Sequence, residues 1–199
     1  MGMSYAVLMP IIAKDVLHGG PHTLGFLMAA AGVGALIGAL SLASRESVLG
    51  LGKWIVRGAA VLGIGLILTS LSRTMWLSFI LLLLIGFGMM VQMASSNTVL
   101  QTIVDDDKRG RVMSFYAMAF MGMAPFGSLI AGSLASKIGA PNTLIFGGIC
   151  CLIGSAIFAS RLPTLRKIVR PIYVKLGIIP EIATGIESAS DLTLSQKRF

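Results

Sequence analysis

The residues best suited to chemistry in this sequence form a short polar cluster inside a long apolar run. The segment VQMASSNTVLQT places Gln92, Ser95, Ser96 and Asn97 together, with Gln101 one helical turn later. Amide and hydroxyl groups bind a solute through hydrogen bonds and are neither strong bases nor activated nucleophiles. Because unpaired polar groups are costly in hydrocarbon, these side chains face either a wet cavity or a neighbouring helix. Both alternatives stay open from the sequence.

Methionine side chains surround the polar cluster in the same region of the sequence. They are Met89, Met90, Met93, Met118, Met121 and Met123. Thioether side chains are flexible and polarisable and adapt to large apolar ligands, although most of these methionines are expected to pack in the core. The candidates for the wall of a solute cavity are Gln92, Met93, Ser96, Asn97 and Met121.

The sequence contains no cluster of residues that is typical of nucleophilic catalysis or of a metal site. The Gly-Ser pairs at 127 and 132 have no histidine within an apolar run that would activate the hydroxyl. His18 and His22 flank a Gly-Gly-Pro turn, where a metal pair is the less favoured interpretation. A phosphate-binding glycine loop is also missing. The sequence therefore predicts no enzyme, no catalytic residue, no metal site and no cofactor.

The elements that hold these residues are expected to be membrane helices. Of the 199 residues, 55% are hydrophobic and only 12% are charged. The mean hydropathy is +0.88. Charge-free runs cover 16–44, 58–72, 74–104, 112–136 and 138–160. With their flanks they reach the roughly 20 residues that cross about 30 Å of hydrocarbon, so the pattern predicts five spans.

A sixth apolar segment, MGMSYAVLMPIIA, opens the chain. Its 13 residues form a helix of roughly 20 Å, which is too short to cross a bilayer. It lacks the basic n-region and the small-residue cleavage site of a secretory signal. It is therefore expected to be the second part of a span that begins outside this sequence.

The expected architecture is an all-α integral membrane bundle of six helices at 1–160. The helices are expected at about 1–17 (truncated), 24–43, 54–72, 75–101, 111–135 and 142–160. GALIGALSLASR, at 34–45, resembles GSLIAGSLASK, at 127–137. Because these segments end helices of opposite direction, they favour two inverted three-helix repeats, as in secondary transporters. The alternative is chance similarity between two spans rich in small residues.

Basic residues are distributed unevenly between the two sides of the expected bundle. Of 16 Lys and Arg residues, 13 lie after the second helix, after the fourth helix or in the tail, and three lie on the opposite side. The positive-inside rule makes the richer side cytoplasmic. The net charge of +8 therefore indicates topology, and nucleic acid is not an expected partner. The basic tail, 161–199, is expected to be cytoplasmic, amphipathic at first and disordered after about Ser188.

A dense charged segment separates the fourth and fifth expected helices. It runs from Asp105 to Arg111 and holds three acids and three bases in seven residues. Gly110 is expected to let the chain turn, and Asp105 or Asp106 to cap the next helix or pair with Arg109 or Arg111. A static surface ion pair contributes only about 0–1 kcal/mol. The segment is therefore a candidate latch that forms in one conformation and breaks in another.

Two long stretches carry a family resemblance. They are YAVLMPIIAKDVLHGGPHTLGFLMAAAGVGALIGAL and VDDDKRGRVMSFYAMAFMGMAPFGSLIAGSLASKIGAPNTLIFGG. Together they resemble the carboxy-terminal half of a major facilitator superfamily transporter, in the branch of enterobactin-type siderophore exporters and macrolide-efflux-like permeases. The resemblance implies helices 7 to 12 of a twelve-helix fold, with the first, second, fourth and fifth helices of this chain lining a cavity. Many members of the family have a degenerate form of the loop motif Gly-x-x-x-Asp-Arg-x-Gly-Arg at the corresponding loop. The loop GALSLASRESVLGLGK of this sequence lacks the Asp of that motif.

The expected function is transmembrane transport in the plasma membrane. The resemblance implies efflux of a small amphipathic solute, siderophore-like or drug-like, by alternating access. The expected partners are the lipid bilayer, the solute, and either an amino-terminal six-helix half or a second copy of this chain. A non-transporting membrane fragment or an interaction subunit is the alternative.

Overall fold

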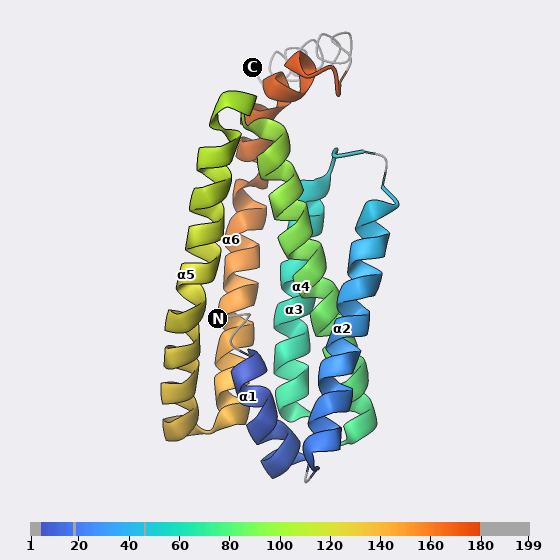
Figure 1. Ribbon diagram of the computed structural model, residues 1–199, viewed down its shortest axis with the longest axis vertical. Helices are drawn as coiled ribbons and strands as arrows, with labels where there is room; N and C mark the ends of the chain where they lie inside the picture. Colours follow the sequence, from blue (N-terminus) through green and yellow to red (C-terminus); the bar gives the residue numbers. More distant parts are fainter. Residues whose placement is uncertain (1–4, 18, 46, 180–199) are drawn as a thin grey trace, which may run out of the picture. The chain divides into compact units, whose positions relative to one another are not determined.

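The computed structural model of this chain describes residues 5–17, 19–45 and 47–179. Over these residues every regular element is helical, so the expected all-α class is confirmed. The elements are α1 (Tyr5–Ile11), the π-helical turn η2 (Ile12–Val16), α2 (Pro21–Ala43), α3 (Leu51–Leu71), α4 (Met75–Ile103), α5 (Asp106–Ile138) and α6 (Ala140–Lys175), as Figure 1 shows.

Five of these helices, α2 to α6, are long and apolar enough to cross a membrane. They contain 21 to 36 residues, and their most apolar windows have mean hydropathies of 1.5 to 2.2. The five expected spans are therefore present as helices of suitable length and composition. α1 is a helix of only 7 residues.

Several helix ends differ from the sequence expectation. α2 begins at Pro21, because a proline in the first turn loses no helical hydrogen bond. α5 begins at Asp106, where acidic side chains interact favourably with the helix dipole. α6 continues to Lys175, although one compact unit of the chain ends at Ser160 and a second begins at Arg161. The expected disorder after Ser188 lies outside the described residues, as does His18.

Proline explains the change of helix type at the end of α1. Pro10 has no backbone N–H and interrupts the ordinary hydrogen-bond ladder. The chain continues as the π-helical turn η2, closed by a hydrogen bond of 3.0 Å from the Leu17 N–H to the Ile12 carbonyl. The Gly19 N–H then donates to the Ala13 carbonyl at 2.8 Å, and this bond ends the turn before α2.

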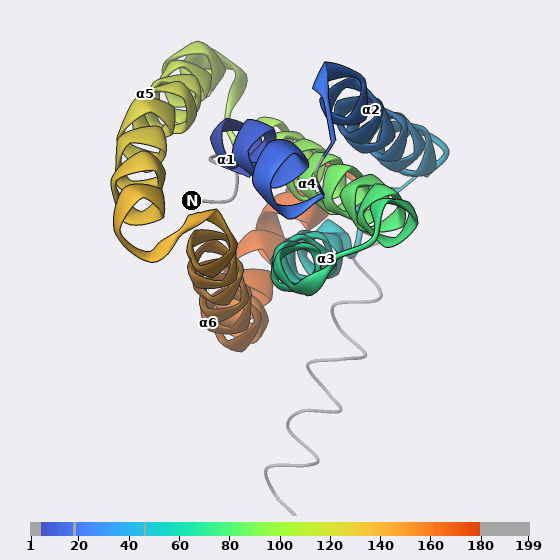
Figure 2. The ribbon, with the colours of Figure 1, turned by 90° about the horizontal axis from the view of Figure 1, so that it is seen from below.

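Small residues let α2 and α4 pack backbone to backbone. A Cβ atom added to Gly34 of α2 would lie 2.7 Å from the carbonyl carbon of Leu83 in α4, and still closer to its oxygen. A Cβ added to Gly86 of α4 would meet the Ala31 carbonyl in the same way. Figure 2 shows α4 between α2 and α3. Ala30, Gly34 and Gly38, four residues apart on α2, are small residues at the spacing that lets membrane helices approach closely, and this close approach contributes packing energy in lipid.

Hydrogen bonds connect α3 and α6 near both ends of their contact. The Ser70 hydroxyl donates to the Pro141 carbonyl at 2.7 Å. The Ser155 hydroxyl donates to the Val56 carbonyl at 2.9 Å. Both hydroxyls lie in spans whose other side chains are mostly apolar, so each bond satisfies a donor that would otherwise be costly to bury.

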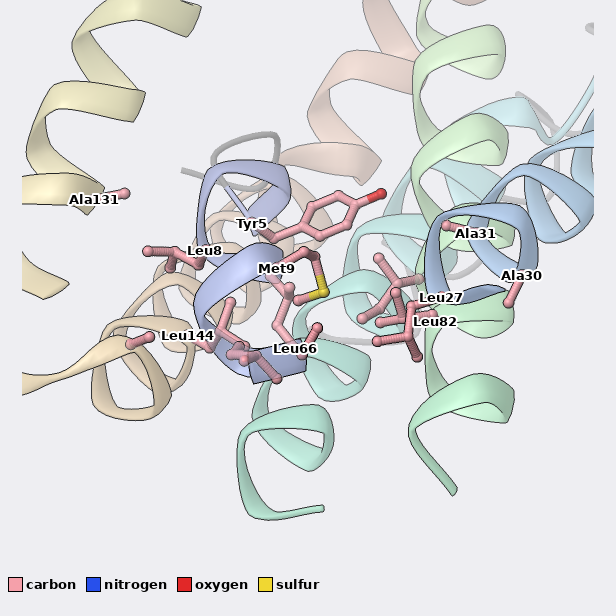
Figure 3. Packing of buried hydrophobic residues seen from close by; sticks show 14 of the residues in the cluster. Tyr5, Leu8, Met9, Leu27, Ala30, Ala31, Leu66, Leu82, Ala131 and Leu144 are labelled. Atoms are coloured by element: carbon pink, nitrogen blue, oxygen red, sulfur yellow. The ribbon is translucent and has the colours of Figure 1, made fainter. Parts of the chain in front are cut away.

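The main hydrophobic core surrounds α1 and η2. Met9 is fully buried, and Figure 3 shows it in the middle of side chains from the neighbouring helices. The buried residues of this core include Tyr5, Leu8, Met9, Ile12, Ala13, Leu27, Ala30, Ala31, Leu62, Leu66, Leu82, Ile85, Ala131, Ala140 and Leu144. A short helix thus fills the centre of one half of the bundle.

α5 packs more loosely than the other long helices. Its only buried residues in the described chain are Gly127 and Ala131. Phe115 is 70% exposed and Leu129 is 72% exposed. Figure 2 shows α5 and α2 at opposite edges, with α1, α3 and α4 between them. The exposed apolar side of α5 needs lipid or another protein surface to cover it.

Candidate functional site

A pocket of about 620 Å³ lies between α3, α4, α5 and α6. The volume falls in the range of about 300–1,000 Å³ that is typical of small-molecule sites. Its lining residues are Ile55, Val56, Ala59, Leu62, Met89, Gln92, Met93, Ser96, Tyr116, Ala119, Phe120, Met123, Ala124, Cys151, Gly154, Ser155 and Phe158. We call this cavity the four-helix pocket.

Three of the five predicted cavity residues line the four-helix pocket. They are Gln92, Met93 and Ser96, which follow one side of α4. The Ser96 hydroxyl donates to the Gln92 backbone carbonyl at 2.8 Å. Within the described residues the Gln92 carboxamide has no hydrogen-bond partner. It therefore offers N–H donors and a carbonyl acceptor to a ligand.

The other two predicted cavity residues lie outside the pocket. The Asn97 side-chain carbonyl accepts a hydrogen bond of 2.6 Å from the Gln101 amide, one turn along α4. Met121 is 74% exposed on α5. Ser95, from the same polar cluster, is fully buried and its hydroxyl has no partner among the described residues. The polar cluster therefore has three different environments. Gln92 and Ser96 line the pocket, Asn97 bonds to Gln101 within α4, and Ser95 is buried.

The aromatic residues that line the pocket were not predicted from the sequence. The rings of Tyr116 and Phe120 stack with centroids 6.1 Å apart and an angle of 21° between their planes. Phe158 of α6 also lines the pocket. The spacing of four residues between Tyr116 and Phe120 was the available signal, because it places both rings on one side of a helix. It is also common in ordinary apolar spans.

The lining of the four-helix pocket suits a ligand that binds through van der Waals contacts and hydrogen bonds. Among the described lining residues there is no acidic or basic side chain. A charged ligand group would lose its hydration without gaining an opposite charge, which is unfavourable in an apolar site. Aromatic rings, thioethers and one free carboxamide instead match an apolar molecule with a few neutral polar groups.

The walls of the pocket differ from those that the resemblance implied. The resemblance assigned cavity lining to the helices expected at 1–17, 24–43, 75–101 and 111–135. In the structure α3 and α6 supply two of the four walls. Leu62 belongs both to the core around α1 and to the pocket. The helices that surround α1 therefore continue past it and surround the pocket.

The charged segment 105–111, which was expected to turn at Gly110, is mostly helical. α5 begins at Asp106, so Gly110 lies inside the helix and not in a turn. Asp105 occupies the N-cap position but makes no side-chain capping bond. The difference has a physical reason: acids in the first helical turn stabilise that end of the helix, and one glycine costs a helix only about 1 kcal/mol.

Ion pairs occur within this charged segment. Arg109 contacts Asp106 at 2.6 Å, and Lys108 contacts Asp105 at 3.6 Å. All four side chains are exposed to a large degree. Arg111 forms no ion pair with a described residue. Of the predicted latch contacts, the structure thus contains the pair Asp106–Arg109.

A cation–π contact in the α2–α3 connection was also missed. The Arg45 guanidinium lies 5.1 Å from the centroid of the Trp54 ring, and that of Arg57 lies 6.0 Å from it. Arg45 also donates to the Leu49 carbonyl at 3.3 Å. From the sequence, Arg45 and Arg57 are interpreted only as indicators of membrane topology. Which aromatic ring each of them contacts depends on the fold of the connection.

Comparison with known proteins supports a transport function. A family model described as "Transmembrane secretion effector" matches residues 2–171. The staphyloferrin A transporter of Staphylococcus aureus (strain NCTC 8325 / PS 47) is 27% identical over 157 residues, which cover 79% of this chain and 39% of that protein. The multidrug efflux pump Tap of Mycolicibacterium fortuitum is 26% identical over 148 residues, which cover 74% of this chain and 36% of that protein. No solved structure matches the chain at a significant level.

The extent of these matches has two consequences. The chain spans less than two fifths of the length of these curated relatives, by their coverage of 39% and 36%. The family match extends over most of the chain and covers α2 to α5, and α6 as far as Pro171. The chain therefore belongs to the transmembrane secretion effector family of the major facilitator superfamily, as a multi-pass membrane protein of the transporter type.

Proposed function

We propose that this chain is the carboxy-terminal half of a plasma-membrane exporter for small amphipathic solutes of the siderophore or drug type. Its helices would correspond to helices 7 to 12 of the superfamily fold, built from two inverted three-helix repeats, with the carboxy terminus in the cytoplasm. Alternating access would arise when this bundle rocks against a second bundle around a solute held between or within them.

One observation carries this proposal. A chain of an exporter-like family contains a pocket of about 620 Å³ whose wall includes the Gln92 carboxamide, which is unpaired among the described residues. An unpaired amide in an apolar span is costly unless water or a solute satisfies it. We assign solute contact to Gln92, Met93 and Ser96 in the pocket, and to Asn97 and Met121 where they face outward.

A second six-helix body is the proposed partner. Phe26, Leu36 and Leu40 of α2 are 59%, 60% and 61% exposed, and Phe115 and Leu129 of α5 are exposed to a similar or greater degree. Lipid covers part of such a surface in any membrane protein. An amino-terminal half, or a second copy of this chain, would cover the remainder and complete the transport path.

The charged segment at the start of α5 is the proposed latch. The Asp106–Arg109 pair is exposed, so as a static contact it stabilises the fold by no more than about 1 kcal/mol. Its proposed role is to form in one state of the transport cycle and to break in another, together with Asp105, Gly110 and Arg111. Small energy differences of this size are sufficient to change the populations of two conformations.

The function is tested by solute accumulation in the source organism. A strain that lacks the gene is complemented with the complete gene, either unchanged, as Gln92→Leu or as Thr98→Val. The probes are N-phenyl-1-naphthylamine, which is uncharged, and the organism's own secreted iron chelators. We expect deletion to raise the retention of at least one probe and Gln92→Leu to reproduce much of that effect. Thr98→Val is the matched control, because this exposed hydroxyl of α4 has the Ala94 carbonyl as its one partner within the part of the chain that the structure describes.

Two results would count against the proposal. Unchanged retention of every probe after deletion would contradict export and would favour a non-transporting membrane component. Export that is lost equally in Gln92→Leu and Thr98→Val, at equal protein levels, would contradict the assignment of the solute contact to the pocket side of α4.

A further inference from the structure

The last turns of α6 form a helix with two distinct sides. At about 100° per residue, Leu162, Leu165, Ile168, Val169, Ile172 and Tyr173 fall within an arc of roughly 140°. Arg166, Lys167 and Arg170 fall within roughly 100° on the other side. We call residues 161–175 the basic segment. Arg161, at the first residue of the segment, lies within the apolar arc, and Lys175, at the last residue, lies about 20° outside that arc, beside Ile168.

The apolar side of the basic segment is partly exposed in the structure. Ile168 is 61% exposed and Leu165 is 38% exposed. On the other side Arg166 and Lys167 are exposed. The segment holds five basic residues and no acidic residue in 15 positions. A helix with this distribution of charge and apolar area is neutralised by an anionic surface into which its apolar side can insert.

We infer that the basic segment binds the surface of a membrane that contains anionic phospholipid. Its apolar side would enter the region between headgroups and acyl chains, and its bases would contact lipid phosphates. A soluble acidic protein is the less suitable partner, because the segment follows directly on a membrane-spanning part of the same helix. This inference concerns a surface outside the four-helix pocket and does not depend on transport.

Proline supplies the change of direction that such binding needs. Pro163 lies inside α6, three residues after Ser160, where the first compact unit of the chain ends. A proline cannot donate to the carbonyl four residues earlier, so the helix bends easily at this point. A span that crosses the bilayer can therefore be followed by a helix that lies along its surface.

Site-specific fluorescence in lipid nanodiscs tests the inference with the full chain. Cys150 and Cys151 are replaced by Ala, and a nitrobenzoxadiazole label is attached to Ile168→Cys on the apolar side or to Val174→Cys on the basic side. Discs contain phosphatidylcholine alone or with phosphatidylglycerol. We expect the label at position 168 to become brighter and blue-shifted in the anionic discs, and the label at position 174 to respond weakly.

Charge is tested in the same discs. Replacement of Arg166 and Lys167 by Gln is expected to lower the response at position 168 by about threefold or more, since each base near an anionic surface contributes about fivefold to association. High salt should have the same effect, because it screens exposed charges. Circular dichroism checks that the variant keeps its helix content.

Three results would overturn the inference. They are an equal signal at position 168 in neutral and anionic discs, an equal response at positions 168 and 174, and a response that persists after both bases are replaced. None of these results bears on export, which the accumulation experiment measures separately. The two proposals can therefore fail independently.

Discussion

The backbone contact between α2 and α4 predicts that one substitution has opposite effects at two neighbouring glycines. At Gly32 a new methyl group meets nothing within 4 Å, so Gly32→Ala gains helix propensity, up to about 1 kcal/mol. At Gly34 the methyl group would lie 2.7 Å from the carbonyl carbon of Leu83 and closer to its oxygen. A backbone atom cannot rotate away, so the two helices must separate.

The expected size of the effect follows from these two contributions. Overpacking of a tight contact costs about 1–3 kcal/mol, and separation of α2 from α4 places Gly34→Ala near the upper end. After the gain in helix propensity, we expect a net loss of about 2 kcal/mol for Gly34→Ala. The two variants should therefore differ by about 3 kcal/mol in the free energy of unfolding.

The assay is unfolding in mixed micelles as the mole fraction of dodecyl sulfate rises, followed by far-ultraviolet circular dichroism. Gly132→Ala on α5 is a second control, because its added methyl group would also meet nothing within 4 Å. Equal midpoints for Gly34→Ala and Gly32→Ala would refute the reasoning. That result would mean that α2 and α4 do not approach each other as closely as the structure places them.

Three further predictions concern polar and aromatic contacts. Ser155→Ala removes the donor to the Val56 carbonyl and should cost about 0.5–1.5 kcal/mol in the same unfolding assay, so an unchanged midpoint would contradict that bond. Arg109→Ala breaks the pair with Asp106 and should change stability by less than about 1 kcal/mol while it slows export; an unchanged rate would leave the segment as a topology signal only. Trp54→Leu removes the ring beneath two guanidinium groups and should lower the free energy of unfolding by about 0.5–1 kcal/mol, whereas a rise would contradict the contact.

The spans could be predicted because hydrocarbon imposes a simple rule on sequence. A helix that crosses a bilayer needs about 20 mostly apolar residues, and the charge-free runs of this chain, lengthened by flanking residues in the case of 58–72, mark α2 to α6. The small residues Ala30, Gly34 and Gly38, four apart in the sequence, also indicate a close helix contact, because this spacing is enriched where membrane helices pack. The helix ends were predicted less accurately. Asp106 and Pro21 are each compatible with a loop as well as with the first turn of a helix, and in the structure they begin α5 and α2.

The walls of the four-helix pocket could not be predicted for a related reason. In a soluble protein the core side of a helix differs from its solvent side, and the difference gives a period of 3.6 residues. In a membrane the lipid side is apolar as well, so Ile55 of α3 and Phe158 of α6 resemble lipid-facing residues in the sequence. Gln92, Met93 and Ser96 are the lining residues that the sequence identified, and the amide of Gln92 and the hydroxyl of Ser96 distinguish these two from the apolar background.

The two hydrogen bonds between α3 and α6 limit how this bundle can move. One joins Ser70 to Pro141 and the other joins Ser155 to Val56, so they fix the axial register of two antiparallel helices at separate heights. A slide of even one residue, about 1.5 Å, would strain both bonds at once. Shear along this contact is therefore disfavoured, and internal rearrangement is expected in α5, which has the fewest buried residues among the long helices of the described chain. In this bundle we expect α3 and α6 to stay fixed relative to each other, and α5 to be the helix that moves.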